Sequence, residues 1–353
     1  MSKKRIEWID IVKAIGMFLI VMGHTLEVYT FSGFAKWIFA VHVPVFFVLS
    51  GYLFRAKPFK TVFQSGWRNL LLPYLATAVI VYLLSFLHPF FPNWFYQVDA
   101  REYFLRVLYG SGTNIDFFLD KTVHIQAIGA IWFLVAMFVG NVLFNGLVKL
   151  KEHVAKESVL VLTVFLMTVL GFYLTKKGIY LPWSLNAALV SQSFYYAGHL
   201  FRRVEAIDKG DWALTLVGLG LWGLSAQSGF FYLNVASAAA PTLAVLGGIG
   251  GSYVLMFGAY KLCRWRSWRG LAYYGKMSLA VLCIHLIEMS ATTSAGRFYH
   301  ACLALGASQV VAVFSEIVYR TLITIMFIVI LPHLPGLRSF YLNRRYPFRA
   351  KKV

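Results

Sequence analysis

Residues 6–28 read IEWIDIVKAIGMFLIVMGHTLEV, an apolar run long enough to cross a bilayer as a helix. Within this run lie three ionisable side chains, Asp10, Lys13 and His24. At about 100° of rotation per residue, all three fall on one face of a helix. Lys13 and His24 are about 16 Å apart along the axis at about 1.5 Å per residue, so this face extends along the helix. Because ionisable groups inside a membrane are costly and usually functional, we interpret it as part of a functional site.

The rest of the chain has the composition of a multi-pass membrane protein. Of its 353 residues, 59% are hydrophobic and 13% are charged, well outside the usual range of a soluble domain. Apolar runs of spanning length occur near residues 6–28, 34–54, 70–90, 127–148, 158–175, 183–201, 212–229, 235–260, 272–291 and 308–331. We therefore predict an all-α, polytopic integral-membrane helix bundle of about ten transmembrane helices, formed by one domain over residues 1–353.

The positions of lysine and arginine predict how this bundle is oriented. The formal net charge is +19, and the basic residues gather in alternate short connections between the apolar runs. These connections contain Arg55, Lys57, Lys60 and Arg68; Lys149, Lys151 and Lys156; Arg202, Arg203 and Lys209; and Lys261, Arg264, Arg266 and Arg269. Together with Lys3, Lys4 and Arg5, they favour cytoplasmic positions for both termini, with an outer loop at 91–126 and a cytoplasmic tail at 332–353. Charge in such connections does not indicate a nucleic-acid partner.

Cysteine spacing and the first apolar run argue against two further features. Cys263, Cys283 and Cys302 have no paired spacing, so we expect neither a disulfide framework nor a metal site. The first run has no A-x-A cleavage site and contains Asp10 and Lys13, so we expect an uncleaved anchor rather than a removable signal peptide.

The outer loop contains one segment with a helical pattern. Residues 99–109 space their apolar side chains along one face of a helix. The remaining positions are polar or charged, which predicts an interfacial helix or a lid.

The second apolar run contains the segment VHVPVFFVLSGY at residues 41–52. Pro44 frees a backbone carbonyl within the membrane, and Ser50 together with the glycine after it permits close packing. We therefore predict an irregular, hydrated site at this point. His42 is expected at a depth similar to that of His24, in the outer half of the membrane.

His24 is the candidate general base. A neutral imidazole can remove a proton from a hydroxyl near neutral pH and return it later. Glu27, at i+3, or a carboxylate from another helix is expected to orient the ring. The alternative is that His24, like His42, is a polar group that packs against a neighbouring helix.

Lys13 and Arg68 are candidates for contact with an anionic donor. Lys13 either pairs with Asp10 or snorkels, or it holds an anionic or carbonyl group that enters from the cytoplasm. Arg68 precedes an apolar run, where it either contacts phosphate or anchors the helix at the inner face.

A second polar face is predicted in the apolar run 272–291. Ser278, His285 and Glu288 share one side of this helix by their i, i+7 and i+3 spacing, and we expect this face to confront the first one. In the last apolar run, Glu316 and Arg320 are at i, i+4 and are expected to neutralise each other.

At these residues the chain resembles the type-3 integral-membrane acyltransferases, and most closely their fucose 4-O-acetylase-like subgroup. Two pieces carry most of the resemblance: Trp8-Ile9-Asp10 through Lys13 to Gly23-His24, and His42-Val43-Pro44 through Phe46-Phe47 to Ser50-Gly51-Tyr52. Further pieces are Leu72-Pro73-Tyr74, Ile131-Trp132-Phe133-Leu134, Tyr195-Tyr196-Ala197-Gly198, and Gly275 through Ser278-Leu279 to His285.

The resemblance implies a ten-helix enzyme of the bacterial inner membrane. Such enzymes move an acyl group, usually acetyl, from cytoplasmic acyl-CoA to a sugar hydroxyl of O-antigen, capsule, exopolysaccharide or a lipid-linked unit. His24 matches the essential histidine of the family, and Asp10 matches the acidic residue that opens the same motif. Lys13 stands where many members have arginine, which does not bind in the same bidentate way.

The residues and the resemblance together predict an O-acyltransferase that uses acetyl-CoA as co-substrate and binds no resident cofactor. In this interpretation, acyl-CoA phosphates lie near Arg68, Asp10 holds Lys13 along the entry, and His24 deprotonates the acceptor. Direct transfer and an acyl-enzyme both remain open. The candidate catalytic residues are His24, Asp10 and Lys13, and the candidate substrate-binding residues are His42, Arg68, Ser50, Trp132, Ser278, His285 and Glu288.

Two other functions are consistent with buried charge and broken helices. One is a transporter or flippase for a lipid-linked sugar, which an inverted internal repeat would support, and we find none. The other is a non-catalytic scaffold for a glycan-assembly complex. The expected partners are acyl-CoA, a glycan or lipid-linked sugar, and membrane lipids, and a homo-oligomer is left open.

Overall fold

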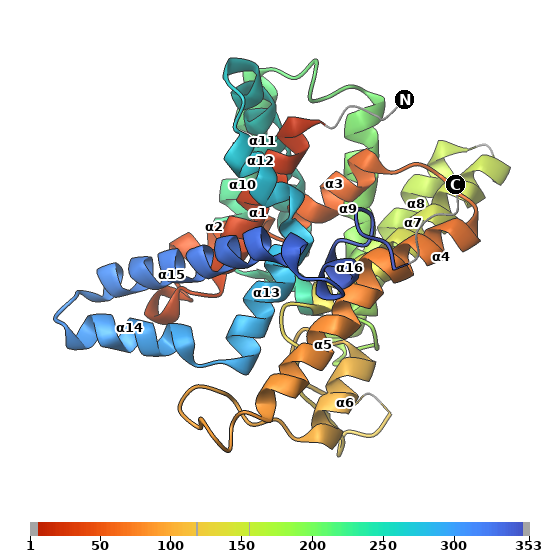
Figure 1. Cartoon of the computed structure of the whole chain (residues 1–353). Coiled ribbons are helices and arrows are strands. Elements are labelled where there is room, and N and C mark those ends of the chain that lie inside the picture. The colour runs from red at the N-terminus through yellow and green to blue at the C-terminus, as the bar shows by residue number, and fades with distance from the viewer. Residues whose placement is uncertain (1–5, 118, 155, 349–353) are drawn as a thin grey trace. The chain divides into compact units, whose positions relative to one another are not determined.

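The computed structural model describes residues 6–117, 119–154 and 156–348 (Figure 1). It is 72% helical, which confirms the predicted helical character. Lys3, Lys4 and Arg5, which entered the prediction of orientation, and residues 349–353 of the predicted tail lie outside these ranges. Internal contacts group the chain into two compact units. The first unit is Met1–Lys57, Leu143–Ile179 and Asn186–Ser278, and the second is Pro58–Val142, Tyr180–Leu185 and Leu279–Val353. One domain over the whole chain and cytoplasmic termini stay predictions.

The first unit contains most of the N-terminal and central helices. They are α1 (Glu7–Gly23), α2 (Gly33–Val41), α3 (Pro44–Leu53), the second half of α7 (Trp132–Val154), α8 (Glu157–Lys176), α9 (Leu185–Arg203), α10 (Trp212–Ser228), α11 (Pro241–Trp265) and α12 (Arg269–Lys276). Single 3₁₀ turns lie at Glu27–Tyr29 and Leu233–Val235, and β3 (Phe231–Tyr232) pairs antiparallel with β4 (Ser237–Ala238).

Glycines let several helices of the first unit approach closely. Gly218 of α10 and Gly250 of α11 face each other, and a Cβ on Gly218 would lie 2.9 Å from the Gly250 carbonyl oxygen. Gly51 of α3 faces the backbone of α9, and Gly198 of α9 faces the backbone of α3. In the same way, Gly275 of α12 meets the backbone of α1 at Asp10. The hydrophobic effect does not drive membrane helices together, because lipid is as apolar as their side chains. Close packing at small residues stabilises such crossings instead.

The second unit contains the remaining helices. They are α4 (Phe59–Gly66), a π-helical turn (Trp67–Leu71), α5 (Leu72–Ser85), α6 (Ala100–Tyr109), the first half of α7, α13 (Ser278–Ala291), α14 (Ser294–Ala304), α15 (Gln309–Ile330), a 3₁₀ turn (Leu331–His333) and α16 (Leu337–Tyr341). β1 (Ile115–Asp116) pairs antiparallel with β2 (His124–Ile125). In Figure 1, α14 and α15 run side by side and are joined by a tight turn at Gly306, whose φ is 87°.

The helix predicted in the outer loop is present as α6. The Asp99 carboxylate accepts a hydrogen bond of 2.8 Å from the Glu102 amide at its start, and Gly110 ends it in the left-handed conformation. Tyr109 packs with Ile115 of β1, and burial raises the pKa of its hydroxyl to about 12. The hydroxyl therefore stays protonated and donates to the Tyr180 carbonyl, which links α6 to the segment 180–185 of the same unit.

Within the described ranges, six helices are long and apolar enough to cross a membrane, or seven with one bent pair. They are Gly33–Leu53, Phe59–Ser85, Trp132–Val154, Glu157–Lys176, Pro241–Trp265 and Gln309–His333, and the bent pair is α12 with α13, at 68°. The predicted count of ten is not confirmed. α1 and α10 have 17 residues each, somewhat short of the usual span of about 20 residues, and α9 carries several polar side chains.

The α1–α12 contact predicts a sharp difference between two glycines of one helix. A Cβ at Gly275 would overlap the backbone of α1, whereas nothing lies within 4 Å of such an atom at Gly270. Gly275→Ala should therefore lower the free energy of unfolding in detergent by about 1–3 kcal/mol. Gly270→Ala should leave it unchanged or raise it by up to about 1 kcal/mol. Equal melting curves for the two variants would contradict the close contact.

Candidate functional site

The charged pair predicted in the first apolar run is present in α1. Lys13 Nζ lies 3.6 Å from Asp10 Oδ1, and Asp10 is 4% exposed. Asp10 is buried within the first unit, whereas the Lys13 side chain is 27% exposed. Opposite charges at this distance offset part of the cost of burying the Asp10 carboxylate. The pair therefore holds a partly exposed lysine ammonium beside a buried carboxylate.

His24 stands immediately after the last residue of α1. Its amide donates to the Ile20 carbonyl at 3.1 Å, and its side chain is half-buried. The helix ends at Gly23, so Glu27 does not continue the same helical face. Glu27 instead has a φ of 44° and is exposed. The helical i+3 geometry expected between His24 and Glu27 is therefore not present, and the orienting role of Glu27 stays a prediction.

His42 lies at the break between α2 and α3, which confirms the irregular segment predicted at Pro44. Pro44 is the first residue of α3, where its missing N–H costs nothing. His42 is buried, its ring packs edge-on against Phe39 at 4.9 Å, and its Nδ1 donates to the Ile38 carbonyl at 3.0 Å. Because Nδ1 carries the hydrogen, Nε2 keeps its lone pair in the neutral ring and is available as an acceptor.

The structure brings His24 and His42 together within the first unit. The turn after α1 packs on α2 through Leu26, Ala35 and Ile38, which places the end of α1 beside the end of α2. The two imidazoles lie close enough to interact electrostatically. One end of α1 thus lies near two histidines, and the other carries the Asp10–Lys13 pair.

Ser50 and Ser278 also belong to the first unit. The Ser50 hydroxyl donates to the Phe46 carbonyl at 2.8 Å and is hydrogen-bonded to the buried Tyr195 of α9. These bonds give Ser50 a role in joining α3 to α9. Ser278 is half-buried at the bend where α13 begins.

The other candidates belong to the second unit. Arg68 is exposed on the π-helical turn, and Trp132 is buried at the start of α7. His285 is fully buried on α13. The predicted polar face of α13 is thus present, but it is divided between the units after Ser278.

Glu288 forms a buried ion network that sequence spacing did not reveal. Arg320 Nη1 lies 2.6 Å from Glu288 Oε2, and Arg320 Nη2 lies 3.1 Å from Glu316 Oε1. Ser294 adds a hydroxyl that donates to Glu288 Oε1 at 3.3 Å. The predicted Glu316–Arg320 pair is confirmed, but the link to α13 needs the fold, because the two helices are separated by α14.

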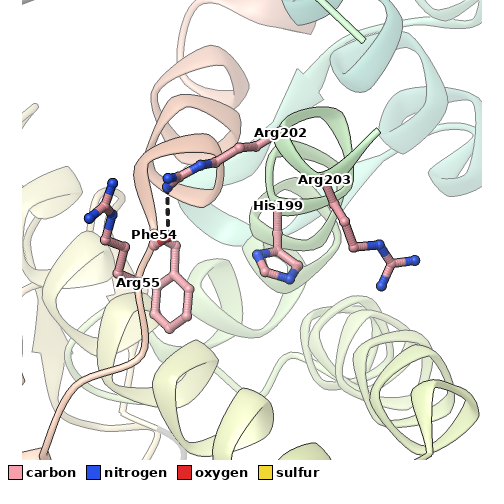
Figure 2. Close-up of a pocket in the computed structure, with 5 residues that line it drawn as sticks. All are labelled: Phe54, Arg55, His199, Arg202 and Arg203. Atoms are coloured by element: carbon pink, nitrogen blue, oxygen red, sulfur yellow. Dashed lines mark hydrogen bonds between the residues drawn. The ribbon is translucent and has the colours of Figure 1, made fainter. Parts of the chain in front are cut away.

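Two cavities in the described part of the chain add residues that the sequence did not single out as a site. One, of about 330 Å³, is lined by Phe54, Arg55, His199, Arg202 and Arg203 in the first unit (Figure 2). In the sequence, the arginines of this cavity served only to predict the orientation of the helix bundle in the membrane. The other, of about 350 Å³ in the second unit, is lined by Phe91, Trp94, Phe95, Thr292 and Ser294.

Comparison with known proteins gives one result. A family model described as an acyltransferase domain, Acyl_transf_3, matches residues 6–332. A search of curated proteins and a search of solved structures each gave no significant match. All the candidate residues named above lie inside the matched range. The match does not distinguish a subgroup, so the fucose 4-O-acetylase-like assignment stays a prediction.

The buried network predicts a large effect at Arg320. Arg320→Met leaves the Glu288 and Glu316 carboxylates buried without their cation, so the free energy of unfolding should fall by about 3–5 kcal/mol. The neutral triple variant Glu288→Gln/Glu316→Gln/Arg320→Met should recover most of that loss, because no charge remains uncompensated. Denaturant titration in detergent measures both. A triple variant no more stable than Arg320→Met would contradict the explanation.

Proposed function

The chain belongs to the Acyl_transf_3 acyltransferase family, and we propose that it moves an acyl group from cytoplasmic acyl-CoA to a hydroxyl of a cell-surface glycan or its lipid-linked precursor. The family and the apolar helices support a multi-pass membrane acyltransferase. In this proposal the acyl group is acetyl, and the membrane is the bacterial inner membrane. The observation that carries the proposal is α1, in which the buried Asp10 pairs with a partly exposed Lys13 and which ends at a histidine near His42.

The reaction requires a base at the acceptor and a way for the thiol to leave. In the proposed step, neutral His24 takes the proton from the acceptor hydroxyl as its oxygen attacks the thioester carbonyl. The carbon–sulfur bond then breaks, the acyl group stays on the oxygen, and the imidazolium returns the proton to the departing CoA sulfur. His42, whose Nδ1 is fixed to the Ile38 carbonyl, presents Nε2 to hold the acceptor or the His24 ring in place.

Asp10 and Lys13 act on the donor rather than at the reacting carbon. Lys13 lies about 16 Å from His24 along the helix axis at about 1.5 Å per residue. An extended pantetheine chain suits such a separation, because its thioester can reach one end while polar groups stay at the other. The Lys13 ammonium, held by Asp10 at 3.6 Å, therefore meets an anionic or carbonyl group of acyl-CoA along its entry.

The remaining candidates are proposed to contact the two substrates. Arg68, exposed on its π-helical turn, meets donor phosphate. Trp132, Ser278 and His285 are kept as candidates for contact with the acceptor. Glu288 and Ser50 act through neighbours, because Arg320 and Tyr195 already hold their polar atoms.

Transport of a lipid-linked sugar is the second candidate function. The buried Glu288–Arg320–Glu316 network and the 68° bend between α12 and α13 are features that transport pathways also use. A transporter leaves the acetyl-CoA thioester intact, so donor consumption separates the two functions.

Replacing His24 tests the proposed base. In inverted vesicles supplied with host glycan lipids and labelled acetyl-CoA, His24→Ala should lower label transfer by about 10²–10⁴-fold, because proton removal is lost. Immunoblotting of the membrane fraction should find normal insertion. His153→Gln, at an exposed position near the end of α7, is the matched control and should transfer at the wild-type rate.

Two results would count against this account. Equal transfer by His24→Ala and wild type would remove His24 as the base. An absence of transfer from either protein, with labelled sugar lipid moved across the vesicle membrane, would replace the enzyme with a transporter.

A further inference from the structure

The 330 Å³ cavity of the first unit is lined by cationic side chains that come from two helix ends. Phe54 and Arg55 follow the last residue of α3, and His199, Arg202 and Arg203 occupy the last turn of α9. Figure 2 shows Arg202 extending toward Phe54 and Arg55, while Arg203 extends the other way beyond His199. The cavity is therefore lined by residues from the end of α3 and from α9, three of which are arginines.

Arg202 is fixed by the backbone that ends α3. Its Nη1 donates to the Phe54 carbonyl at 3.2 Å and lies 3.5 Å from the Tyr52 carbonyl. A guanidinium at the carboxyl end of a helix satisfies carbonyls that have no partner within the helix. Both bonds use the same guanidinium nitrogen of Arg202, and they position the rest of the guanidinium at the cavity.

Arg203 and Arg55 differ in how far their charges are balanced. Arg203 Nη1 lies 2.9 Å from Glu157 Oε2, which Lys151 Nζ also approaches at 2.9 Å. Arg55 is exposed and makes no ion pair with any residue in the described ranges. Among Arg55, Arg202, Arg203, Lys151 and Glu157, four are cations and one is an anion, which leaves three positive charges in surplus. Asp208 and Glu205 both act electrostatically on Tyr52. Glu205 is paired with Lys209 at 2.8 Å, so Asp208 reduces the surplus without cancelling it.

We propose that this cavity binds a phosphate or diphosphate group. Guanidinium forks match the several oxygens of a phosphate better than a single carboxylate, and His199 adds a ring N–H at the same wall. The proposal deepens the proposed function and rests on it for one source of the group, the phosphates of acyl-CoA. The other source is the headgroup of an anionic lipid. The site is thus assigned to Arg55, Arg202 and Arg203, in addition to Arg68.

Binding of CoA tests the first source. The full-length protein is placed in nanodiscs of phosphatidylcholine, and its dissociation constant for radiolabelled CoA is measured. Arg55→Gln should weaken binding about three- to tenfold, as for loss of one partly exposed charged contact. Arg55→Gln/Arg203→Gln should weaken it further, while Lys151 still pairs with Glu157. Arg266→Gln, an exposed arginine between α11 and α12, is the control and should bind as wild type.

Retention of phosphatidylglycerol by the detergent-purified protein, counted by native mass spectrometry, tests the second source. Loss of one retained lipid in the Arg55 variants, with unchanged CoA binding, would support the cavity as a lipid-phosphate site. If the Arg55 variants leave both CoA binding and lipid retention unchanged, the proposal is overturned. If Arg68→Gln alone weakens CoA binding and the Arg55 variants also keep their lipid, this proposal fails, while the acyltransferase proposal stands because its own readout is label transfer.

Discussion

The constraint on which the rest of the structure depends is the burial of ionisable groups in helices that have little water around them. Each such group needs a partner, because an isolated charge in a low-dielectric interior is very costly. Asp10 holds Lys13 in α1, and Arg320 joins Glu288 to Glu316 in the second unit. Neither set of charged residues helps its helix to insert into a membrane. A pair kept in spite of its cost is best understood through chemistry that uses the charge.

Close helix packing makes these pairs possible. Gly275 lets α12 meet α1 at Asp10, and Gly51 and Gly198 let α3 and α9 meet near Ser50. Such crossings exclude lipid and water from the buried polar atoms and fix the helices that carry them. The same α3–α9 crossing ends in the cationic cavity, so packing in the helices determines where the arginines gather. The close helix contacts of the first unit therefore also determine where its charged side chains lie.

Sequence spacing predicted the features that depend on neighbours along one helix. The Asp10–Lys13 and Glu316–Arg320 pairs, α6 and the break at Pro44 all follow from local geometry or from proline. Local patterns could not place the end of α1 at Gly23, because the apolar run continues beyond it, and so Glu27 was expected on the same helical face as His24. They also could not join Glu288 to Arg320 or Arg202 to the Phe54 carbonyl, because those contacts depend on how separate helices pack. The family match covers the candidate residues without assigning them roles.

The central claim is that Asp10 and Lys13 are kept for acyl transfer rather than for folding. The most direct test is the double variant Asp10→Asn/Lys13→Met, compared with wild type for unfolding in detergent and for transfer of label from acetyl-CoA in vesicles. Because removing both charges leaves neither uncompensated, stability should remain close to wild type. The account predicts a folded protein whose transfer falls by at least about 10²-fold, in the range expected when a positioned catalytic contact is lost. A folded double variant that transfers label at the wild-type rate would contradict it.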